Sequence, residues 1–404
     1  MTTVRDSRDF SPQLRAAMVS ELRSMGAITS DRVAQAVAAV PRHLFVPGQP
    51  LEAVYAADHA LVIKRDPDGA ATSSLSSAHI QSVMLEQAEI VPGMRVLEIG
   101  SGGYNAALIA ELVGETGEVV SIDIDPEITE RARACLDSAG YERVKVVVGD
   151  AEHGVPGEDA FDRIVVTAGA WDIPPAWRTQ LTARGRLIVP LRLKGVTRTI
   201  AFEADGEGLA SVSYLLSGFV PMQGDGQHHE RVLAVGDDES WGLRVDEGAP
   251  DFDAAGLRAA LVHTRVERWS GAAFDLPDEL ELFLLTRGGP HMVMLHARQA
   301  LVEQGVFAPS ALRGVPVLVS DDGSFAYRIK RENPDVGGFE SGVIAHGPAA
   351  GQVADEYVDL LRHWARDHPR RGAATIGYIP TGGPTEHAVE GIPKRHGTVA
   401  ITWC

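Results

Sequence analysis

A glycine-rich turn between an apolar run and a helical stretch is the first feature of this sequence that could bind a ligand. The run Val96 to Ile99 leads into Gly100, Gly102 and Gly103, and helical spacing begins at Asn105. Glycine lets the backbone turn tightly and approach a ligand, while the amides at a helix start can bind polar groups. The order of strand, glycine loop and helix therefore predicts a site for a nucleotide-like cofactor.

Two acidic residues follow at the ends of the next two apolar runs. Asp123, about twenty residues beyond the loop, could accept hydrogen bonds from both ribose hydroxyls. Asp150, after Gly149, is placed to contact an adenine edge. Dinucleotide binding is the competing interpretation, but the loop carries Glu98 and lacks the G-x-G-x-x-G spacing, which favours S-adenosylmethionine. The predicted cofactor contacts are Glu98, Gly100, Ser101, Gly102, Tyr104, Asn105, Asp123, Ile124, Gly149, Asp150, Ala151 and Thr167.

A serine-rich segment precedes this motif and is the candidate acceptor site. A methyl acceptor that is already ionised at neutral pH needs no general base, because it is itself a nucleophile. Such a site mainly has to position two reactants. Ser76 is the first candidate to hold the acceptor, although serines here also suit a polar loop or a helix cap. The predicted substrate contacts are Ser74, Ser77, His79, Ala170, Trp171 and His228, and no metal site is predicted.

The elements that must position these residues alternate between short apolar runs and amphipathic stretches. This alternation predicts a doubly wound, mostly parallel sheet whose ligands bind at the carboxyl ends of the strands. Two short helices are predicted between residues 11 and 40, and residues 66 to 77 read as a loop. The predicted strands are 95–99, 118–122, 145–148, 163–167 and 186–190, and the predicted helices between them are 105–113, 126–139 and 175–181.

The length of 404 residues exceeds what one core usually supports, so two domains are expected. We expect a catalytic domain over residues 1–222, and an accessory or substrate-binding domain of α/β character over residues 223–404. The second region carries no motif that indicates chemistry of its own.

The composition narrows the classes of partner. A formal net charge of -18 opposes binding to nucleic acid and to an anionic membrane surface. No apolar run is long enough to cross a bilayer, and the first ten residues lack the apolar core of a secretory signal. Cys135 and Cys404 are the only cysteines, which argues against a disulfide framework. A cytoplasmic protein is expected.

Separate blocks in the same order along residues 11 to 222 carry a family resemblance. Val40 to Arg42 with Phe45 to Pro47 match a V-P-R-x-x-F-V-P signature, and Val96 to Tyr104 matches a cofactor loop. Together they resemble the protein L-isoaspartyl O-methyltransferases, which implies a Rossmann-like class I fold, S-adenosylmethionine as cofactor and a polypeptide carboxylate as acceptor. Further matching blocks are Tyr55 with Asp58, Ser76 to Ser82, Phe161 to Ile164, Gly185 to Leu187 with Pro190, and Phe219 to Pro221.

The sequence also departs from that family's pattern. The loop Gly100 to Tyr104 is one residue shorter than G-x-G-x-G-Y, and Ser77 and Ala78 follow Ser76 where a small residue and proline are usual. The long carboxyl-terminal extension is absent from simple repair enzymes. The extension, together with Asn105, Asp123, Asp125, Ala170 and Trp171, resembles a branch of the family, the FxLD-system methyltransferases that accompany lanthipeptides and related ribosomally made peptides.

This second resemblance implies esterification of an aspartate in a modified precursor peptide, after which the next backbone amide closes an aspartimide. Two alternatives remain open at this stage. One is repair of L-isoaspartate or D-aspartate in damaged proteins, and the other is a non-catalytic module that binds the donor and assembles a peptide complex.

Overall fold

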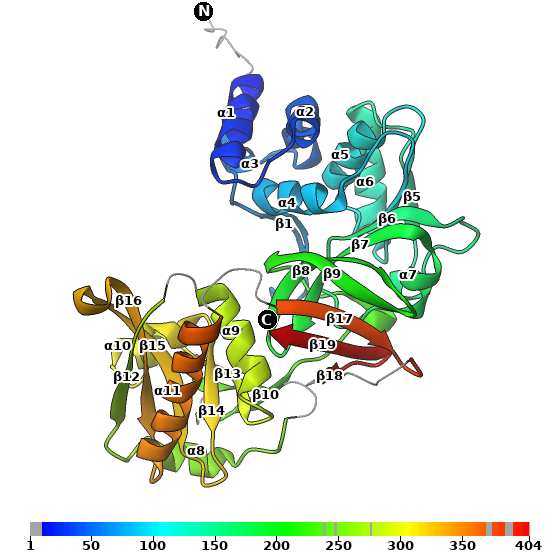
Figure 1. Cartoon of the computed structure of the whole chain (residues 1–404). Helices are drawn as coiled ribbons and strands as arrows, with labels where there is room; N and C mark the ends of the chain where they lie inside the picture. Colours follow the sequence, from blue (N-terminus) through cyan, green and yellow to red (C-terminus); the bar gives the residue numbers. More distant parts are fainter. Residues whose placement is uncertain are drawn as a thin grey trace, which may run out of the picture. The chain divides into compact units, whose positions relative to one another are not determined.

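The structure, a computed structural model, describes residues 10–236, 240–245, 249–274, 277–368, 374–383 and 391–403. The chain divides into two compact units (Figure 1). The first runs to Leu191 and continues over Thr197–His228, and the second comprises Arg192–Val196 and the chain from His229 onward. Each unit has its own core of buried apolar side chains.

Short helices open the first unit. The predicted pair between residues 11 and 40 is confirmed. The first helix ends before Gly26, whose φ of 71° suits glycine, and the Ser30 side chain caps the second by accepting a bond from the Val33 amide. The helices before the main sheet are α1 (Ser11–Ser24), α2 (Asp31–Ala39), η1 (Arg42–Phe45), α3 (Leu51–Val54) and α4 (Ala78–Ala88).

The main sheet of the first unit has the strand order β9-β8-β7-β6-β3-β4-β5. Its central pairs are parallel, and the order reverses at β3, which has β6 on one side and β4 on the other. Ile99 is in register with both Ile122 and Val166, so the carboxyl ends of three strands meet at one edge. The strands are β3 (Arg95–Ile99), β4 (Glu118–Asp123), β5 (Lys145–Val148), β6 (Phe161–Val166), β7 (Leu181–Leu193), β8 (Val196–Asp205) and β9 (Gly208–Leu216).

Helices connect the parallel strands, as the alternating pattern predicts. Almost every residue of α5 is buried, and its N-terminus follows Gly103 directly at the carboxyl end of β3. The connecting helices are α5 (Tyr104–Val113), α6 (Pro126–Ser138), η2 (Ala151–His153) and α7 (Pro175–Thr179), and η3 (Gly224–Gly226) lies near the end of the unit. This Rossmann-like arrangement places ligands at the edge where β3 and β4 end.

The prediction of a loop over residues 66 to 77 is wrong for its second half. The strands β1 (Leu61–Arg65) and β2 (Ala71–Leu75) form an antiparallel hairpin, in which Lys64 pairs with Ser73. The turn between them is closed by the Ala70 amide, which donates to Asp66 Oδ1 at 2.8 Å. A run of threonine and serine has no apolar alternation, so only the pairing with β1 makes this segment a strand.

The second unit is rich in strands and contains a seven-stranded antiparallel sheet with the order β10-β11-β13-β14-β15-β16-β12. The amphipathic helix α11 (Ala350–Asp367) packs against this sheet through Val353, Tyr357 and Leu361. The strands are β10 (Arg231–Ala234), β11 (Trp241–Val245), β12 (Val266–Phe274), β13 (Met292–Ala297), β14 (Val315–Val319), β15 (Phe325–Asn333) and β16 (Gly338–His346).

The remaining elements of the second unit are short. They are the helices α8 (Ala254–Ala260), α9 (Pro277–Arg287), α10 (Gln299–Glu303), η4 (Pro309–Leu312) and η5 (Pro334–Val336), and the strands β17 (Ala374–Pro380), β18 (Gly391–Pro393) and β19 (Gly397–Trp403). β19 pairs antiparallel with both β17 and β18.

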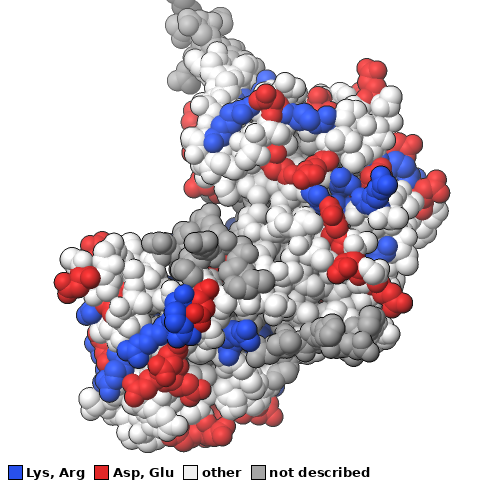
Figure 2. Space-filling model, viewed as in Figure 1, with Lys and Arg blue, Asp and Glu red and all other residues white. Residues whose placement is uncertain are grey.

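The surface of the protein carries charges of both signs. On the face drawn in Figure 2, basic and acidic side chains lie in small groups of both signs. In the part of the chain that the structure describes, no helix combines the length and the apolar character needed to cross a bilayer. Cys135 is buried and free, whereas Cys404 lies outside the described residues.

Candidate active site

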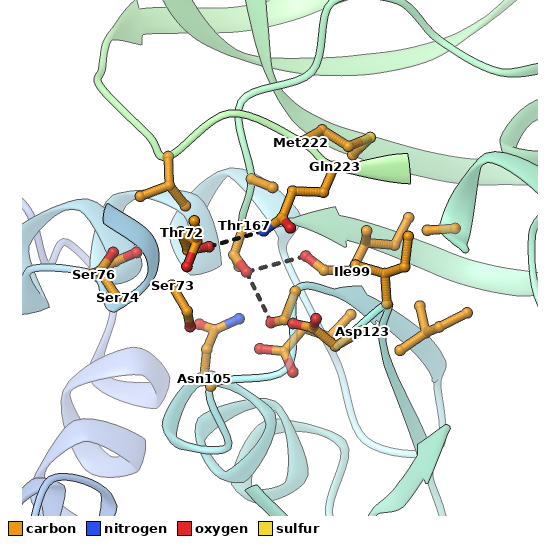
Figure 3. A pocket seen from close by; sticks show the side chains of 18 of the residues that line it. Thr72, Ser73, Ser74, Ser76, Ile99, Asn105, Asp123, Thr167, Met222 and Gln223 are labelled. Carbon is orange, nitrogen blue, oxygen red and sulfur yellow. Dashed lines mark hydrogen bonds between the residues drawn. The ribbon is translucent and has the colours of Figure 1, made fainter. Parts of the chain in front are cut away.

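A cavity of about 780 Å³ opens where β3 and β4 end (Figure 3). Every lining residue belongs to the first unit. The lining combines the glycine loop, the ends of three strands, the β1–β2 hairpin, the start of α4 and the segment Val220 to Gln223.

Eleven of the residues singled out from the sequence line this cavity. Nine of them are predicted cofactor contacts and two are serines of the hairpin. They are Ser74, Ser76, Glu98, Gly100, Gly102, Asn105, Asp123, Ile124, Asp150, Ala151 and Thr167.

Two buried polar groups on the cavity wall are unsatisfied. Glu98 is fully buried, and its Oε2 accepts a bond from the Ser121 hydroxyl at 2.5 Å. Among the described residues, neither Glu98 Oε1 nor Asn105 Nδ2 makes a hydrogen bond of good geometry, although Asn105 lies close enough to Glu98 to lower its pKa against the effect of burial. Burial raises the pKa of Glu98 to about 7. A carboxylate and an amide donor in this state fit the ammonium and carboxylate of an amino acid, the two groups at one end of S-adenosylmethionine.

Asp123 is held at the end of β4 by backbone amides. Its Oδ2 accepts from the Ser101 amide at 2.8 Å and its Oδ1 from the Asp125 amide at 3.0 Å. Burial raises the pKa of Asp123, while these amide bonds oppose the rise. A fixed carboxylate with free lone pairs beside the cavity fits a ribose diol.

Close packing explains the glycine at the start of the loop. Gly100 has a φ of 99°, and a Cβ there would lie 2.5 Å from Thr167 Oγ1. The Thr167 hydroxyl lies 3.0 Å from the Ile99 carbonyl oxygen and 2.9 Å from that of Gly100, so it can donate to either (Figure 3). The end of β6 is thereby tied to the loop.

Both carboxylate oxygens of Asp150, the predicted adenine contact, accept bonds from backbone amides, as those of Asp123 do. Asp150 Oδ1 accepts from the Glu152 amide at 2.9 Å, and Oδ2 accepts from the Asp225 amide at 2.7 Å. Asp150 therefore anchors the segment that ends at η3. His153 also approaches Asp225 at 2.9 Å, so Asp150, His153 and Asp225 form a cluster of side chains that could ligate a metal.

Several predicted site residues do not line the cavity. Ser101 and Gly149 support Asp123 through backbone bonds, since the Gly149 amide donates to the Asp123 carbonyl at 2.9 Å. Ser77 caps α4 by accepting from the Ile80 amide, and the His79 amide donates to Ala57. The other four are the buried residues Tyr104, Ala170 and Trp171, and His228, whose ring stacks on Trp171 with centroids 3.5 Å apart.

The cavity also includes residues that the sequence analysis did not select. Gln223 Nε2 donates to the Thr72 carbonyl at 3.2 Å, which joins the closing segment to the hairpin (Figure 3). Gln81 could have been selected from its position alone. It lies in the first turn of the helix that follows Ser76, so its side chain can reach the same cavity. The unselected lining residues are Thr72, Ser73, Leu75, Gln81, Ile99, Ile122, Ala168, Val220, Pro221, Met222 and Gln223.

The fold and the cavity define a class I S-adenosylmethionine-dependent methyltransferase. Residues 13–227 match the model of the family described as Protein-L-isoaspartate(D-aspartate) O-methyltransferase. The chain belongs to this family, and it is accordingly an S-adenosylmethionine-dependent protein carboxyl O-methyltransferase.

Two relatives illustrate the match. The chain is 42% identical over 179 residues to a protein-L-isoaspartate O-methyltransferase of Methanopyrus kandleri, a match that covers 44% of this chain and 76% of that protein. It is 39% identical over 198 residues to protein-L-isoaspartate O-methyltransferase 2 of Archaeoglobus fulgidus, which covers 48% of this chain and 87% of the relative.

A solved structure bears on the carboxyl-terminal extension. It is described as a protein-L-isoaspartate O-methyltransferase and aligns with a TM-score of 0.52 at 21% identity, covering 96% of this chain and 99% of its own. The similarity of fold thus extends over both units. At this identity the alignment shows a similarity of fold alone.

Proposed function

We propose that this protein methylates the free α-carboxylate of L-isoaspartyl residues in polypeptides. The family match and the relatives named above support this acceptor. The observation that carries the proposal is one cavity whose wall includes both the unsatisfied pair Glu98 and Asn105 and the serine hairpin that ends at Ser76. The arrangement offers a donor half and an acceptor half within reach of each other.

We assign the donor half as follows. Glu98 binds the ammonium group of S-adenosylmethionine, Asn105 donates to its carboxylate, and Asp123 accepts from its ribose. Gly100 and Gly102 leave room for the cofactor along the loop backbone. When bound, S-adenosylmethionine supplies an electrophilic methyl group on sulfur.

In the acceptor half, Ser76 and Ser74 hold the acceptor by donating hydrogen bonds to its carboxylate. No residue has to remove a proton, because the acceptor is ionised at neutral pH. Ser74 and Ser76 would hold one carboxylate oxygen toward the methyl group that bound S-adenosylmethionine would supply. The residues contribute orientation, and a well-oriented pair of reactants can gain about 7 to 11 kcal/mol in this way.

Methyl transfer to short peptides tests the proposal. A linear isoaspartyl peptide incubated with labelled S-adenosylmethionine should gain one methyl group that is lost in mild base, as esters are. The same peptide with normal aspartate is the control and should gain none. Absence of transfer to every isoaspartyl peptide would refute the proposed function.

The second candidate acceptor is an aspartate side chain in a ribosomally made, modified peptide. Two features support it: the departure from the family's substrate loop at Ser77 and Ala78, and the resemblance that includes Ala170 and Trp171. If this candidate is right, a cyclised precursor peptide should be methylated at least about tenfold more efficiently than linear isoaspartyl peptides. The ester would then close to an aspartimide, with a net loss of water. Cofactor binding without transfer to either peptide would favour the assembly module instead.

For the second unit we propose a role in binding the polypeptide on either side of the acceptor residue. The unit has its own core, and no cavity-lining residue comes from it among those described. Lengthening the peptide around a fixed isoaspartate should lower KM while kcat stays constant. An unchanged KM for peptides of increasing length would contradict this role.

A further inference from the structure

A buried guanidinium lies directly behind the acceptor half of the cavity. Arg42 is fully buried at the start of η1. Its Nη2 donates to the Ser76 carbonyl at 2.6 Å and its Nη1 to Gln81 Oε1 at 2.8 Å. Its Nε donates to the Val54 carbonyl at 2.9 Å. Two of these three acceptors, Ser76 and Gln81, line the cavity, while Arg42 itself stays behind them.

The charge of Arg42 has no anionic partner in the fold. Its three acceptors are neutral, and its fourth neighbour is the ring of Tyr104, whose centroid lies 4.8 Å from the guanidinium carbon. Burial raises the pKa of Tyr104 to about 12, so this phenol is neutral at physiological pH. No carboxylate in the described part of the chain lies within 4.0 Å of Arg42.

A lone buried cation is unfavourable for folding unless something compensates it. Removing an ion from water is costly, and carbonyl oxygens and an aromatic face offset only part of that cost. Burial lowers the pKa of Arg42, but the pKa of a guanidinium starts so high that the group stays charged. The positive charge of Arg42 is therefore separated from the proposed acceptor only by Ser76, to which Arg42 donates.

We propose that Arg42 is a positioning residue that gives the acceptor site its preference for a carboxylate. It holds the Ser76 peptide and the Gln81 amide in place, and its charge attracts an anion on the cavity side of both. This inference rests on the proposed function, since it requires an anionic acceptor beside Ser76. Substrate should therefore be selected by charge as well as by shape.

The test compares two peptides that differ only in charge. One carries isoaspartate and the other carries the same residue with its free carboxylate as a carboxamide. Affinities are measured in the presence of S-adenosylhomocysteine for the wild type, Arg42→Met and Arg42→Lys. The matched control is Arg163→Met. Arg163 is also a buried arginine that donates to a carbonyl, but that carbonyl belongs to Ala88, which does not line the cavity.

Arg42→Met should weaken binding of the carboxylate peptide by about tenfold or more and that of the carboxamide peptide by much less. Arg42→Lys should recover part of the preference, and Arg163→Met should leave it unchanged. If Arg42→Met weakened the binding of both peptides equally, or of neither, the inference would be overturned. Unchanged affinity for S-adenosylhomocysteine shows that the variant is folded.

Gln81→Glu keeps the inference testable if Arg42→Met does not fold. The new carboxylate would lie where Gln81 Oε1 now accepts from Arg42, so the cation gains an internal partner. The preference for the carboxylate peptide should then fall while the thermal midpoint is kept, and a retained preference would contradict the inference. If the wild type methylates no isoaspartyl peptide, the proposed function is wrong. That result is distinct from a wild type that is active but whose charge preference does not depend on Arg42.

Discussion

The donor and acceptor halves of the cavity are built in different ways. The donor half lies on strands at the centre of a buried parallel sheet, where Glu98 and Asp123 are held by backbone and side-chain bonds. The acceptor half lies on a two-stranded hairpin and a closing segment, joined by single contacts such as that of Gln223 with Thr72. A rigid half suits a constant cofactor, and an adaptable half suits polypeptides of many sequences. Substitutions should therefore separate cofactor binding from acceptor turnover.

The largest effect should come from Asp123→Ala. Loss of a fixed acceptor for two ribose hydroxyls should weaken S-adenosylhomocysteine binding by about a hundredfold or more, since bonds to charged groups contribute about 1.5 to 3 kcal/mol each. Calorimetric titration measures this change. Asp137→Ala, an exposed acid on α6, is the control and should bind normally. Equal affinity of the Asp123 variant would remove the ribose assignment.

Ser76→Ala should affect turnover of the acceptor, because Ser76 belongs to the acceptor half of the cavity. We expect kcat/KM for an isoaspartyl peptide to fall by about tenfold, because one hydrogen bond to the acceptor carboxylate is lost. Affinity for S-adenosylhomocysteine should stay unchanged. Steady-state kinetics with Ser77→Ala as the neighbouring control measures the effect, since Ser77 caps α4 instead of lining the cavity. A drop in cofactor affinity for Ser76→Ala would contradict the separation of cofactor binding from acceptor turnover.

The pKa of Glu98, raised by burial to about 7, predicts a pH dependence confined to the donor half. Pairing with an ammonium group favours the ionised carboxylate. If binding lowers this pKa by about one unit, affinity for S-adenosylhomocysteine should rise about fivefold from pH 6 to pH 8. Glu98→Gln should flatten this profile, measured by titration in buffers of equal ionic strength. A profile that persists in the variant would assign the titration to another group.

The same group predicts the opposite trend for stability without cofactor. A carboxyl whose pKa is higher in the folded state stabilises the fold below its unfolded value, near 4.5, and that contribution is lost as the pH rises through about 7. The free energy of unfolding of the unliganded wild type should therefore decline, relative to Glu98→Gln, across this window. Denaturant titrations at several pH values measure these free energies. If the wild type and Glu98→Gln changed in parallel with pH, Glu98 would not be the group responsible.

The smallest effect should follow from loosening the hairpin. Lys64 Nζ pairs with Asp125 at 2.6 Å and Glu127 at 2.5 Å, which ties β1 to the start of α6. Because these groups are partly exposed, Lys64→Met should raise the acceptor KM by less than about fivefold and leave cofactor affinity unchanged. High salt should produce a similar rise in the wild type. An effect on the cofactor alone would contradict the separation.

Much of the donor half was predictable because its signals are local. The strand, loop and helix follow one another within a few residues, and each acid directly follows or closes its own apolar run. The acceptor half was less predictable: β2 resembled a loop because its serines and threonines show no apolar alternation. The stacking of Trp171 on His228, neither of which lines the cavity, also left no signal in the sequence.

The amino-acid sequence by itself determined the class of fold, the glycine loop and the candidate acid at the end of β4, because each follows from short-range patterns of apolar spacing and backbone freedom. Only the tertiary structure decided that Arg42 supports Ser76 across 34 positions of sequence, that Gln223 meets the hairpin, and that Glu98 is buried with one oxygen unsatisfied. These contacts join distant segments, and burial depends on all the neighbours that packing brings together.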